Sequence, residues 1–176
     1  MDIGQLASRI SHLEDLEAIR QLKARYCEIC DADHDPDRIL TIFAADGVWE
    51  GAGFGRAEGH AAIRALFQQF RQMVGFAHHM VLNPLIDLDG DRARGTWQFL
   101  GAFTFREHNA ARWVAVRYTD DYVRTGGEWL FQHLRARWQD LFGVQYEVLL
   151  YDLTSTYFEG AGEEIPKATY GYSRDH

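Results

Sequence analysis

The chain has 176 residues, enough for one domain with a proper hydrophobic core and short for two. Its formal net charge of -8 at pH 7 argues against a nucleic-acid groove built from excess lysine and arginine, so we expect no nucleic-acid partner. No apolar run is long enough to cross a bilayer, and the first residues lack the pattern of a secretory signal. We therefore expect a cytoplasmic protein with no membrane partner.

An apolar stripe at the start of the chain predicts a long amphipathic helix. Ser11 and Glu14 have the spacing of a capping box, which predicts a break in this helix near Ser11. Cys27 and Cys30 lie inside the helical pattern, where two buried thiols are favoured over a zinc or redox motif. The stripe recurs at three- and four-residue spacing and consists of Leu6, Ile10, Leu13, Leu16, Leu22, Tyr26 and Ile29.

Two further helices and a short strand are predicted before the main strands. Asp35 and Pro36 have the chemistry of a helix N-cap and first turn, and they open a short helix that extends to Phe43. A turn at Gly47 leads into a short strand that begins at Val48. The glycine-rich GAGFG is followed by a third helix whose inward side chains are Ile63, Leu66, Phe67, Phe70 and Met73.

From Phe76 onward the apolar period changes to two, which predicts strands. This period assigns Met80, Leu82, Ile86 and Leu88 to one face and His79, Val81 and Asn83 to the other. Turn residues at Gly90, at Asn109 and at the Gly126-Gly127 pair divide the rest into an antiparallel meander. Because helices come first and strands afterwards, the predicted fold class is α+β.

Aromatic residues on one face of the sheet predict both a core and a ligand pocket. The simplest interpretation of these aromatic residues is core, but in a curved sheet the concave face that helps to form the core can also line a ligand pocket. The predicted substrate is therefore small and hydrophobic or aromatic. The residues predicted to contact it are Trp49, Asn83, Trp97, Phe99 and Tyr118.

Asp31 and His79 are the candidate catalytic residues. Asp31 lies late in the first helix, and His79 lies at the start of the first long strand. A neutral imidazole held by a carboxylate accepts a proton near neutral pH without a metal or organic cofactor, so none is expected. On the residues alone, Asp31 also fits a solvated acidic corner and His79 a structural histidine. The aspartate spacing resembles a calcium loop, but Pro36 replaces the required glycine, so calcium is rejected.

Up to about Asp140 the chain resembles the SnoaL-like branch of the nuclear transport factor 2-like superfamily. The resemblance rests on the segments ARYCEICDADHDPDRILTIFAADGVWE, GHAAI, HMVLNPLIDLDGDRA and RYTDDYVRTGGEWLF. It implies a cone-shaped, cystatin-like α+β domain over residues 1–143, with a curved antiparallel or mixed sheet packed on N-terminal helices. It also implies a homo-oligomer, either a trimer or a dimer.

The resemblance also assigns roles to the two candidate residues. In relatives such as scytalone dehydratase and hexachlorocyclohexane dehydrochlorinase, an aspartate of the first helix and a histidine of the sheet form a catalytic dyad, which corresponds to Asp31 and His79. His79 would then abstract a proton, while Asp31 would hold the imidazole in place. Cys30 stands where the dehydratase has a tyrosine, so a donor that helps to expel hydroxide is missing there.

Residues 144–176 form a tail with a different resemblance. YDLTSTYFEG and YGYSRDH resemble a DDE-type insertion-sequence transposase, with Asp152 at the position of its first metal-binding aspartate. This implies that a mobile element replaced the native C-terminus, and that no phosphoryl transfer is expected from a single carboxylate. The alternative is an ordinary extension of the last strand.

Three functions are compatible with these patterns. The first is a lyase or isomerase of the dehydratase or dehydrohalogenase type. The second is a non-catalytic assembly subunit that resembles the β chain of aromatic-ring dioxygenases, and the third is a decayed hybrid protein. The first requires Asp31 and His79 to converge on an enclosed cavity, whereas the other two do not.

Overall fold

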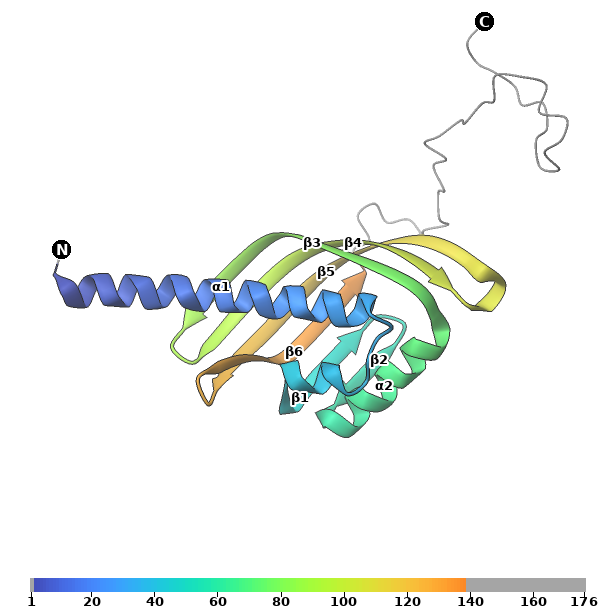
Figure 1. The fold of residues 1–176 in the computed structure, drawn as a ribbon, viewed down its shortest axis with the longest axis horizontal. Coiled ribbons are helices and arrows are strands. Elements are labelled where there is room, and N and C mark those ends of the chain that lie inside the picture. Colours follow the sequence, from blue (N-terminus) through green and yellow to red (C-terminus); the bar gives the residue numbers. More distant parts are fainter. Residues whose placement is uncertain (1, 139–176) are drawn as a thin grey trace, which may run out of the picture.

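The computed structural model describes residues 2–138 (Figure 1). The tail predicted over residues 144–176, with Asp152, lies outside these residues. The helical elements are α1 (Ile3–Asp31), η1 (Arg38–Ile42), α2 (Gly59–Met73) and η2 (Glu107–Asn109). The strands are β1 (Phe43–Gly51), β2 (Gly55–Glu58), β3 (Val74–Asp89), β4 (Arg92–Phe105), β5 (Ala110–Thr125) and β6 (Glu128–Trp138).

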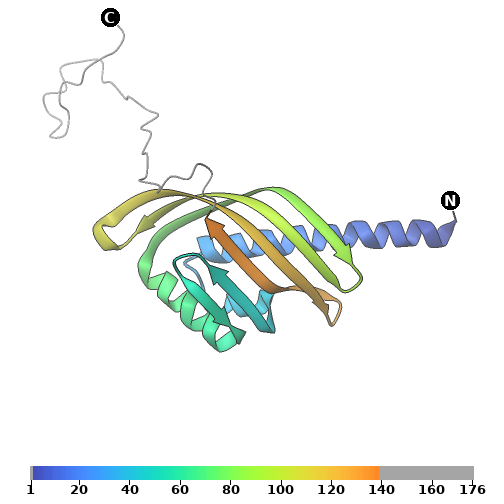
Figure 2. The ribbon, with the colours of Figure 1, turned by 180° about the vertical axis from the view of Figure 1, so that it is seen from behind.

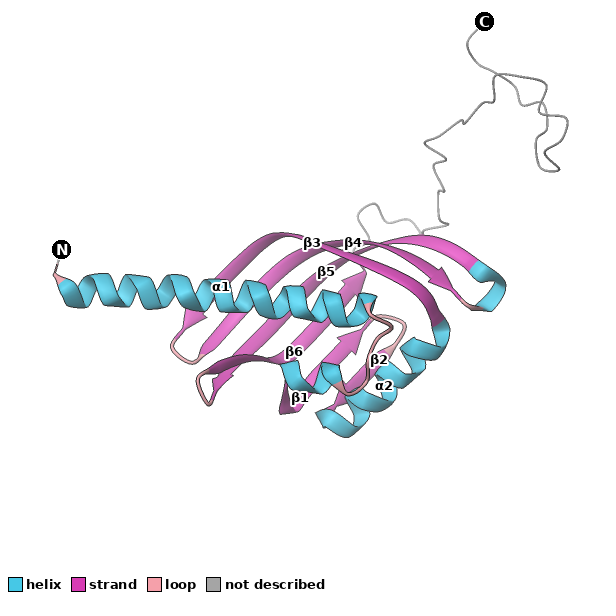
Figure 3. Cartoon of the chain, in the orientation of Figure 1, coloured by secondary structure: helices cyan, strands magenta, loops and turns pink. Residues whose placement is uncertain are grey.

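The strands form one curved, six-stranded sheet in the order β2-β1-β6-β5-β4-β3 (Figure 3). β1 and β6 are parallel, and the other neighbouring strands are antiparallel, so the sheet is mixed. α1 lies across one face, and α2 packs near the β1–β2 end (Figure 1). Figure 2 shows the opposite face of the sheet in front of α1. The predicted α+β class, with a curved sheet on N-terminal helices, is confirmed.

α1 is continuous, so the predicted break near Ser11 is wrong. The capping box lies at the true start of the helix, where the Asp2 side chain accepts from the Gln5 backbone N–H at 2.7 Å and the Gln5 side chain accepts from the Asp2 N–H. Ser11 lies in the helix interior, where every backbone N–H already has an intrahelical acceptor. The N-terminal turns extend past the sheet, and the buried residues begin at Ile19 (Figure 1).

The short helix predicted after α1 is present, but it begins at Arg38 rather than at Pro36 and is more tightly wound. The Asp35 carboxylate accepts from the N–H groups of Asp37 and Arg38 at 2.9 and 3.0 Å, which lowers the pKa of Asp35. The short helix is 3-10 rather than α, and Phe43 already belongs to β1. GAGFG closes a hairpin between β1 and β2 before α2 begins.

A bulge at Asn83 changes which side chains of β3 face the helices. The pairing of β3 with β4 shifts between Leu82 and Leu85, and Asn83 has a φ of 50°. Pro84 has no N–H to donate to the sheet, so the regular ladder cannot continue through this point. Beyond the bulge, Ile86 and Leu88 face the core together with Val81, which contradicts the predicted faces.

The turn predicted at Gly47 is wrong, because β1 runs through Gly47 from Phe43 to Gly51. The turns predicted between the long strands are confirmed, and each uses left-handed backbone. Gly90, Asn109, Gly126 and Gly127 have φ values of 57°, 48°, 62° and 88°. They produce the antiparallel meander of β3, β4, β5 and β6. Within the described range, no helix is long and apolar enough to cross a membrane.

Candidate active site

Asp31 and His79 are in direct contact. Asp31 is the last residue of α1, and His79 lies in β3. The His79 Nδ1 atom is 2.6 Å from Asp31 Oδ1, and the His79 backbone N–H donates to both carboxylate oxygens at 3.0 and 3.1 Å. The His79 side chain is 5% exposed, and that of Asp31 is 27% exposed. The backbone N–H of His79 therefore fixes the Asp31 carboxylate, and the carboxylate in turn holds the His79 ring.

This contact defines the tautomer of His79. An ionised carboxylate only accepts hydrogen bonds, so Nδ1 carries the proton that is donated to Asp31. Nε2 is then left with a free lone pair. The neighbouring acids are engaged elsewhere, because Asp33 pairs with Arg71 at 2.6 Å and Asp37 pairs with Arg64. Asp31 is thus separated from the acidic corner that follows it.

Aromatic rings enclose the His79 imidazole. The ring centroids of Phe99 and Phe103 lie 5.0 and 5.2 Å from that of His79. Gly101 pairs with His79 across the sheet, and a Cβ atom at Gly101 would lie 2.4 Å from Phe99 Cζ. The lack of a side chain at Gly101 therefore allows both rings to close around the imidazole.

A cavity of about 90 Å³ lies beside His79. Its wall is mostly apolar and includes the rings of Trp49, Phe54, Phe70, Phe99, Phe103 and Tyr118. His79, His34 and Cys30 also line it. The arrangement combines an imidazole nitrogen with a largely apolar enclosure, and it can abstract a proton from a hydrophobic molecule.

Two residues predicted to contact substrate do not line this cavity. Asn83 lies in the β3 bulge and is exposed, because the bulge ends the regular alternation of that strand. Trp97 is buried in the core, where its Nε1 donates to the Tyr122 hydroxyl at 3.0 Å. The other three predicted residues, Trp49, Phe99 and Tyr118, do line the cavity.

His34 is a cavity residue that the sequence patterns did not identify. It follows the end of α1 in left-handed backbone with a φ of 50°, so no helix or strand period points to it. Burial, followed by the proximity of His79, lowers the pKa of His34 to about 4. His34 is therefore neutral at pH 7.

Cys27 and Cys30 are free and buried, as predicted. Burial raises the pKa of Cys27 to about 11 and raises the pKa of Cys30 well above its ordinary range. Of the two, only Cys30 reaches the cavity wall.

A second polar pair joins α1 to the sheet away from the cavity. Lys23 Nζ lies 2.9 Å from Asp120 Oδ2, and both side chains are 0% exposed. The Tyr122 hydroxyl donates to the same carboxylate oxygen at 3.0 Å. Burial raises the pKa of Asp120, although Lys23 opposes this shift.

Residues 11–135 match the model of the SnoaL-like domain family, which is most of the chain. The chain belongs to this family. No curated protein matches this SnoaL-like domain in sequence.

Several solved structures resemble the SnoaL-like domain. A hexachlorocyclohexane dehydrochlorinase, LinA type 2, is 23% identical with a TM-score of 0.69, over 73% of this chain and 87% of that chain. A candidate scytalone dehydratase of Novosphingobium aromaticivorans DSM 12444 is 20% identical with a TM-score of 0.69, over 74% and 88%. A nuclear transport factor 2-like protein of Novosphingobium aromaticivorans, with a cystatin-like fold, is 28% identical with a TM-score of 0.65, over 80% and 92%. These similarities establish the cystatin-like, nuclear transport factor 2-like fold.

Proposed function

We propose that this SnoaL-like domain is a lyase or isomerase that acts on a small hydrophobic or aromatic molecule without a metal or organic cofactor. The main support for this proposal is the contact between Asp31 and His79 beside an apolar cavity. The family match, and similar structures that include a dehydrochlorinase and a candidate scytalone dehydratase, support the same class of reaction.

In the proposed reaction, His79 is the general base. Its Nε2 removes a proton from a carbon of the substrate, and the electron pair of that C–H bond forms a double bond. The leaving group, hydroxide or halide, departs with its own bonding pair. Asp31 stabilises the imidazolium that results, and the proton then passes to the departing hydroxide or to solvent. In an isomerase, the same proton would return to a different carbon.

Trp49, Phe99 and Tyr118 are the proposed substrate contacts. All three line the cavity, and their rings present apolar surface to a molecule held near His79. Asn83 and Trp97 are not part of the proposed site, because neither reaches the cavity.

Proton abstraction can be tested without knowing the natural substrate. We would use 5-nitrobenzisoxazole, a small aromatic probe whose N–O bond breaks when a base removes the C–H proton of its isoxazole ring. The expected result is saturable product formation, lowered about 10²- to 10⁴-fold by His79→Gln, the range typical of general-base catalysis. Asp31→Asn should also lower the rate, because an amide does not stabilise the imidazolium.

A matched control is His133→Gln. His133 is a partly buried sheet histidine that contacts Glu50 and does not line the cavity, so this variant should retain the wild-type rate. A wild-type protein with no activity above that of free imidazole, or an active His79→Gln variant, would overturn the proposal. Either result would favour the assembly-subunit or decayed-hybrid alternative.

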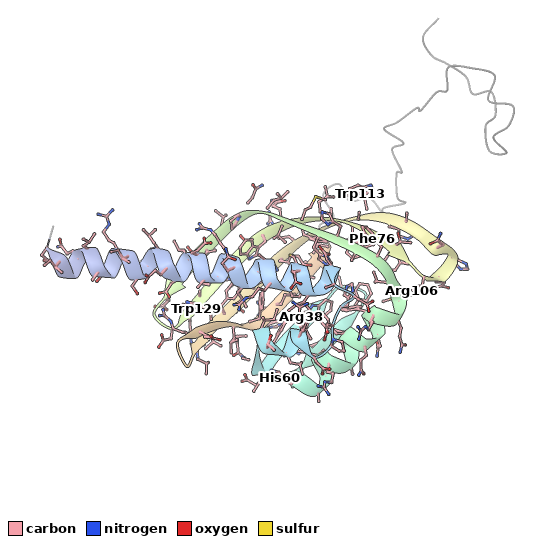
Figure 4. All side chains as sticks on the ribbon, in the orientation of Figure 1. Arg38, His60, Phe76, Arg106, Trp113 and Trp129 are labelled. Atoms are coloured by element: carbon pink, nitrogen blue, oxygen red, sulfur yellow. The ribbon has the colours of Figure 1, made fainter. Side chains whose placement is uncertain are left out.

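We also propose that the protein assembles in the cytoplasm as a trimer or a dimer. The support is a set of exposed apolar side chains on β3, β4 and β5, namely Phe76, Leu82, Leu85, Leu100 and Trp113. Figure 4 labels Phe76 and Trp113. The two free cysteines accord with a reducing compartment. Light scattering on the purified 20.3 kDa chain would test the assembly, and a monomeric mass would contradict it.

A further inference from the structure

Three side chains of the kinds that bind transition metals converge on the cavity wall. They are Cys30 from the last turn of α1, His34 from the turn that follows, and His79 from β3. One potential ligand atom from each lies within 4.8 Å of the other two. All three side chains line the cavity, and none lies on the outer surface.

The chain reversal after α1 brings Cys30 and His34 together. The His34 backbone N–H donates to the Cys30 carbonyl at 3.3 Å, and both Asp33 and His34 have left-handed backbone. This turn directs the His34 ring back over the helix end. Its centroid is 6.2 Å from that of His79, with the two rings at 64° to each other.

The His34 ring has no hydrogen-bond partner among residues 2–137. It is 5% exposed and contacts the rings of Phe67, Phe70 and His79, but it forms no hydrogen bond there. The ring nitrogens of His34 are not among the fully buried side-chain atoms without a partner, which in the described residues are Asp120 Oδ1 and Arg124 Nε. Because His34 lines the cavity, a ligand there can reach its ring.

The spacing suits a small divalent ion. A point exists within about 2.8 Å of all three atoms, which is 4.8 Å divided by the square root of three. Zinc requires about 2.3 Å to sulfur and about 2.0–2.1 Å to nitrogen, so the sulfur must close in by at most about 0.5 Å and the nitrogens by at most about 0.8 Å.

The surroundings also suit such an ion. The Asp31 carboxylate holds Nδ1 of His79, which is the outer-shell partner that metal-binding histidines usually have, and Nε2 remains for the metal. Metal binding releases the Cys30 thiol proton to solvent. The resulting thiolate and the Asp31 carboxylate together carry the two negative charges that balance a divalent ion. The fourth tetrahedral position would face the cavity.

We propose that Cys30, His34 and His79 form a binding site for a divalent transition metal ion such as Zn²⁺, with one coordination position open to the cavity. An ion bound there occupies Nε2 of His79, the atom that acts as the base in the proposed reaction. Metal binding therefore stops proton abstraction. This second consequence rests on the proposed function, whereas the site itself does not.

Cobalt(II) added to the metal-free, full-length protein tests the site. Wild-type protein should bind one equivalent and develop both a thiolate-to-cobalt charge-transfer band and the strong visible bands of tetrahedral cobalt. Cys30→Ser should lose the charge-transfer band, and His34→Ala should weaken binding by more than about tenfold. Cys27→Ser is the matched control, a buried thiol one turn earlier that is not in the cluster, and it should keep both bands.

The outcomes separate the site from the proposed reaction. A wild-type protein without the charge-transfer band, or a Cys30→Ser variant that retains it, overturns the metal site. If one equivalent of Zn²⁺ binds but leaves the rate of the wild type toward 5-nitrobenzisoxazole unchanged, the claim that metal binding stops proton abstraction is contradicted. If cobalt binds as expected but the metal-free protein has no activity toward the probe, the proposed function fails and the metal site stands.

Discussion

Two charged side chains of α1, about two turns apart, reach the sheet and meet different surroundings. Lys23 contacts Asp120 where both are sealed from solvent and from the cavity. Asp31 contacts His79 where the ring lies against the cavity wall. Each contact joins the same helix to the same sheet. Access to the cavity, rather than the presence of an acid and a base, therefore separates a group that stabilises the fold from one that can act on a ligand.

The largest expected effect comes from making the same substitution at both places. Asp120→Asn leaves the Lys23 charge buried without a counter-ion, which should lower the free energy of unfolding by about 3–5 kcal/mol. Asp31→Asn should cost about 1 kcal/mol, since it weakens a partly exposed hydrogen bond. Urea unfolding at pH 7 measures both. Equal losses would show that the two contacts do not differ as described.

Mild acid should also lower the free energy of unfolding, through His34 in the cavity wall. His34 has a pKa of about 4 in the folded protein against an ordinary value of 6.5, so the unfolded chain takes up the proton first as the pH falls. The contribution of the neutral ring to the free energy of unfolding is therefore fully present above pH 6.5. It falls by about 3 kcal/mol as the pH decreases toward 4.

Urea unfolding with a chelator present, at several pH values, measures this loss. His34→Gln is the control, because glutamine does not titrate and the other acidic and basic groups are unchanged. The stability of wild type should therefore fall more steeply below pH 6.5 than that of the variant. Parallel curves for the two proteins would contradict the expected titration of His34.

The smallest expected effect concerns the fit around His79. Gly101→Ala brings a methyl group against Phe99 and Phe103, and overpacking of this kind should cost about 1–3 kcal/mol. Gly75→Ala in β3 is the matched control, because the nearest atom lies 3.4 Å away on the flexible Arg106 side chain. Thermal unfolding of both variants would compare them. If the Gly101 variant is as stable as the Gly75 variant, the rings are not closely packed.

Much of the fold follows from short-range patterns. The turns at Gly90, Asn109 and Gly126 were predictable because left-handed backbone favours glycine and asparagine. The helix α2 was predictable from its apolar period, and its core-facing residues Phe67 and Phe70 are buried as expected. These signals are local, and their structural meaning does not depend on distant parts of the chain.

Two local patterns were misleading for identifiable reasons. The capping-box spacing at Ser11 had no effect, because the residues before it are themselves helical and end in a true cap at Asp2. The period-two pattern of β3 was interrupted by the Asn83 bulge, which moved Ile86 and Leu88 to the other face. A sequence pattern with a single period does not show where a bulge adds a residue and so shifts the alternation of the faces.

The candidate acid and base were recognisable in the sequence, from their places in a helix and a strand and from the family resemblance. Their contact was not, because a 2.6 Å separation depends on how the end of α1 packs on β3. The same packing decides that Trp97 is core while Phe99 lines the cavity, although both lie on one face of β4. His34 reaches the site through the chain reversal after α1, and a residue in such a turn belongs to no helix or strand period in the sequence. Local patterns report which face a residue takes, whereas a site needs several elements to meet at one point in space.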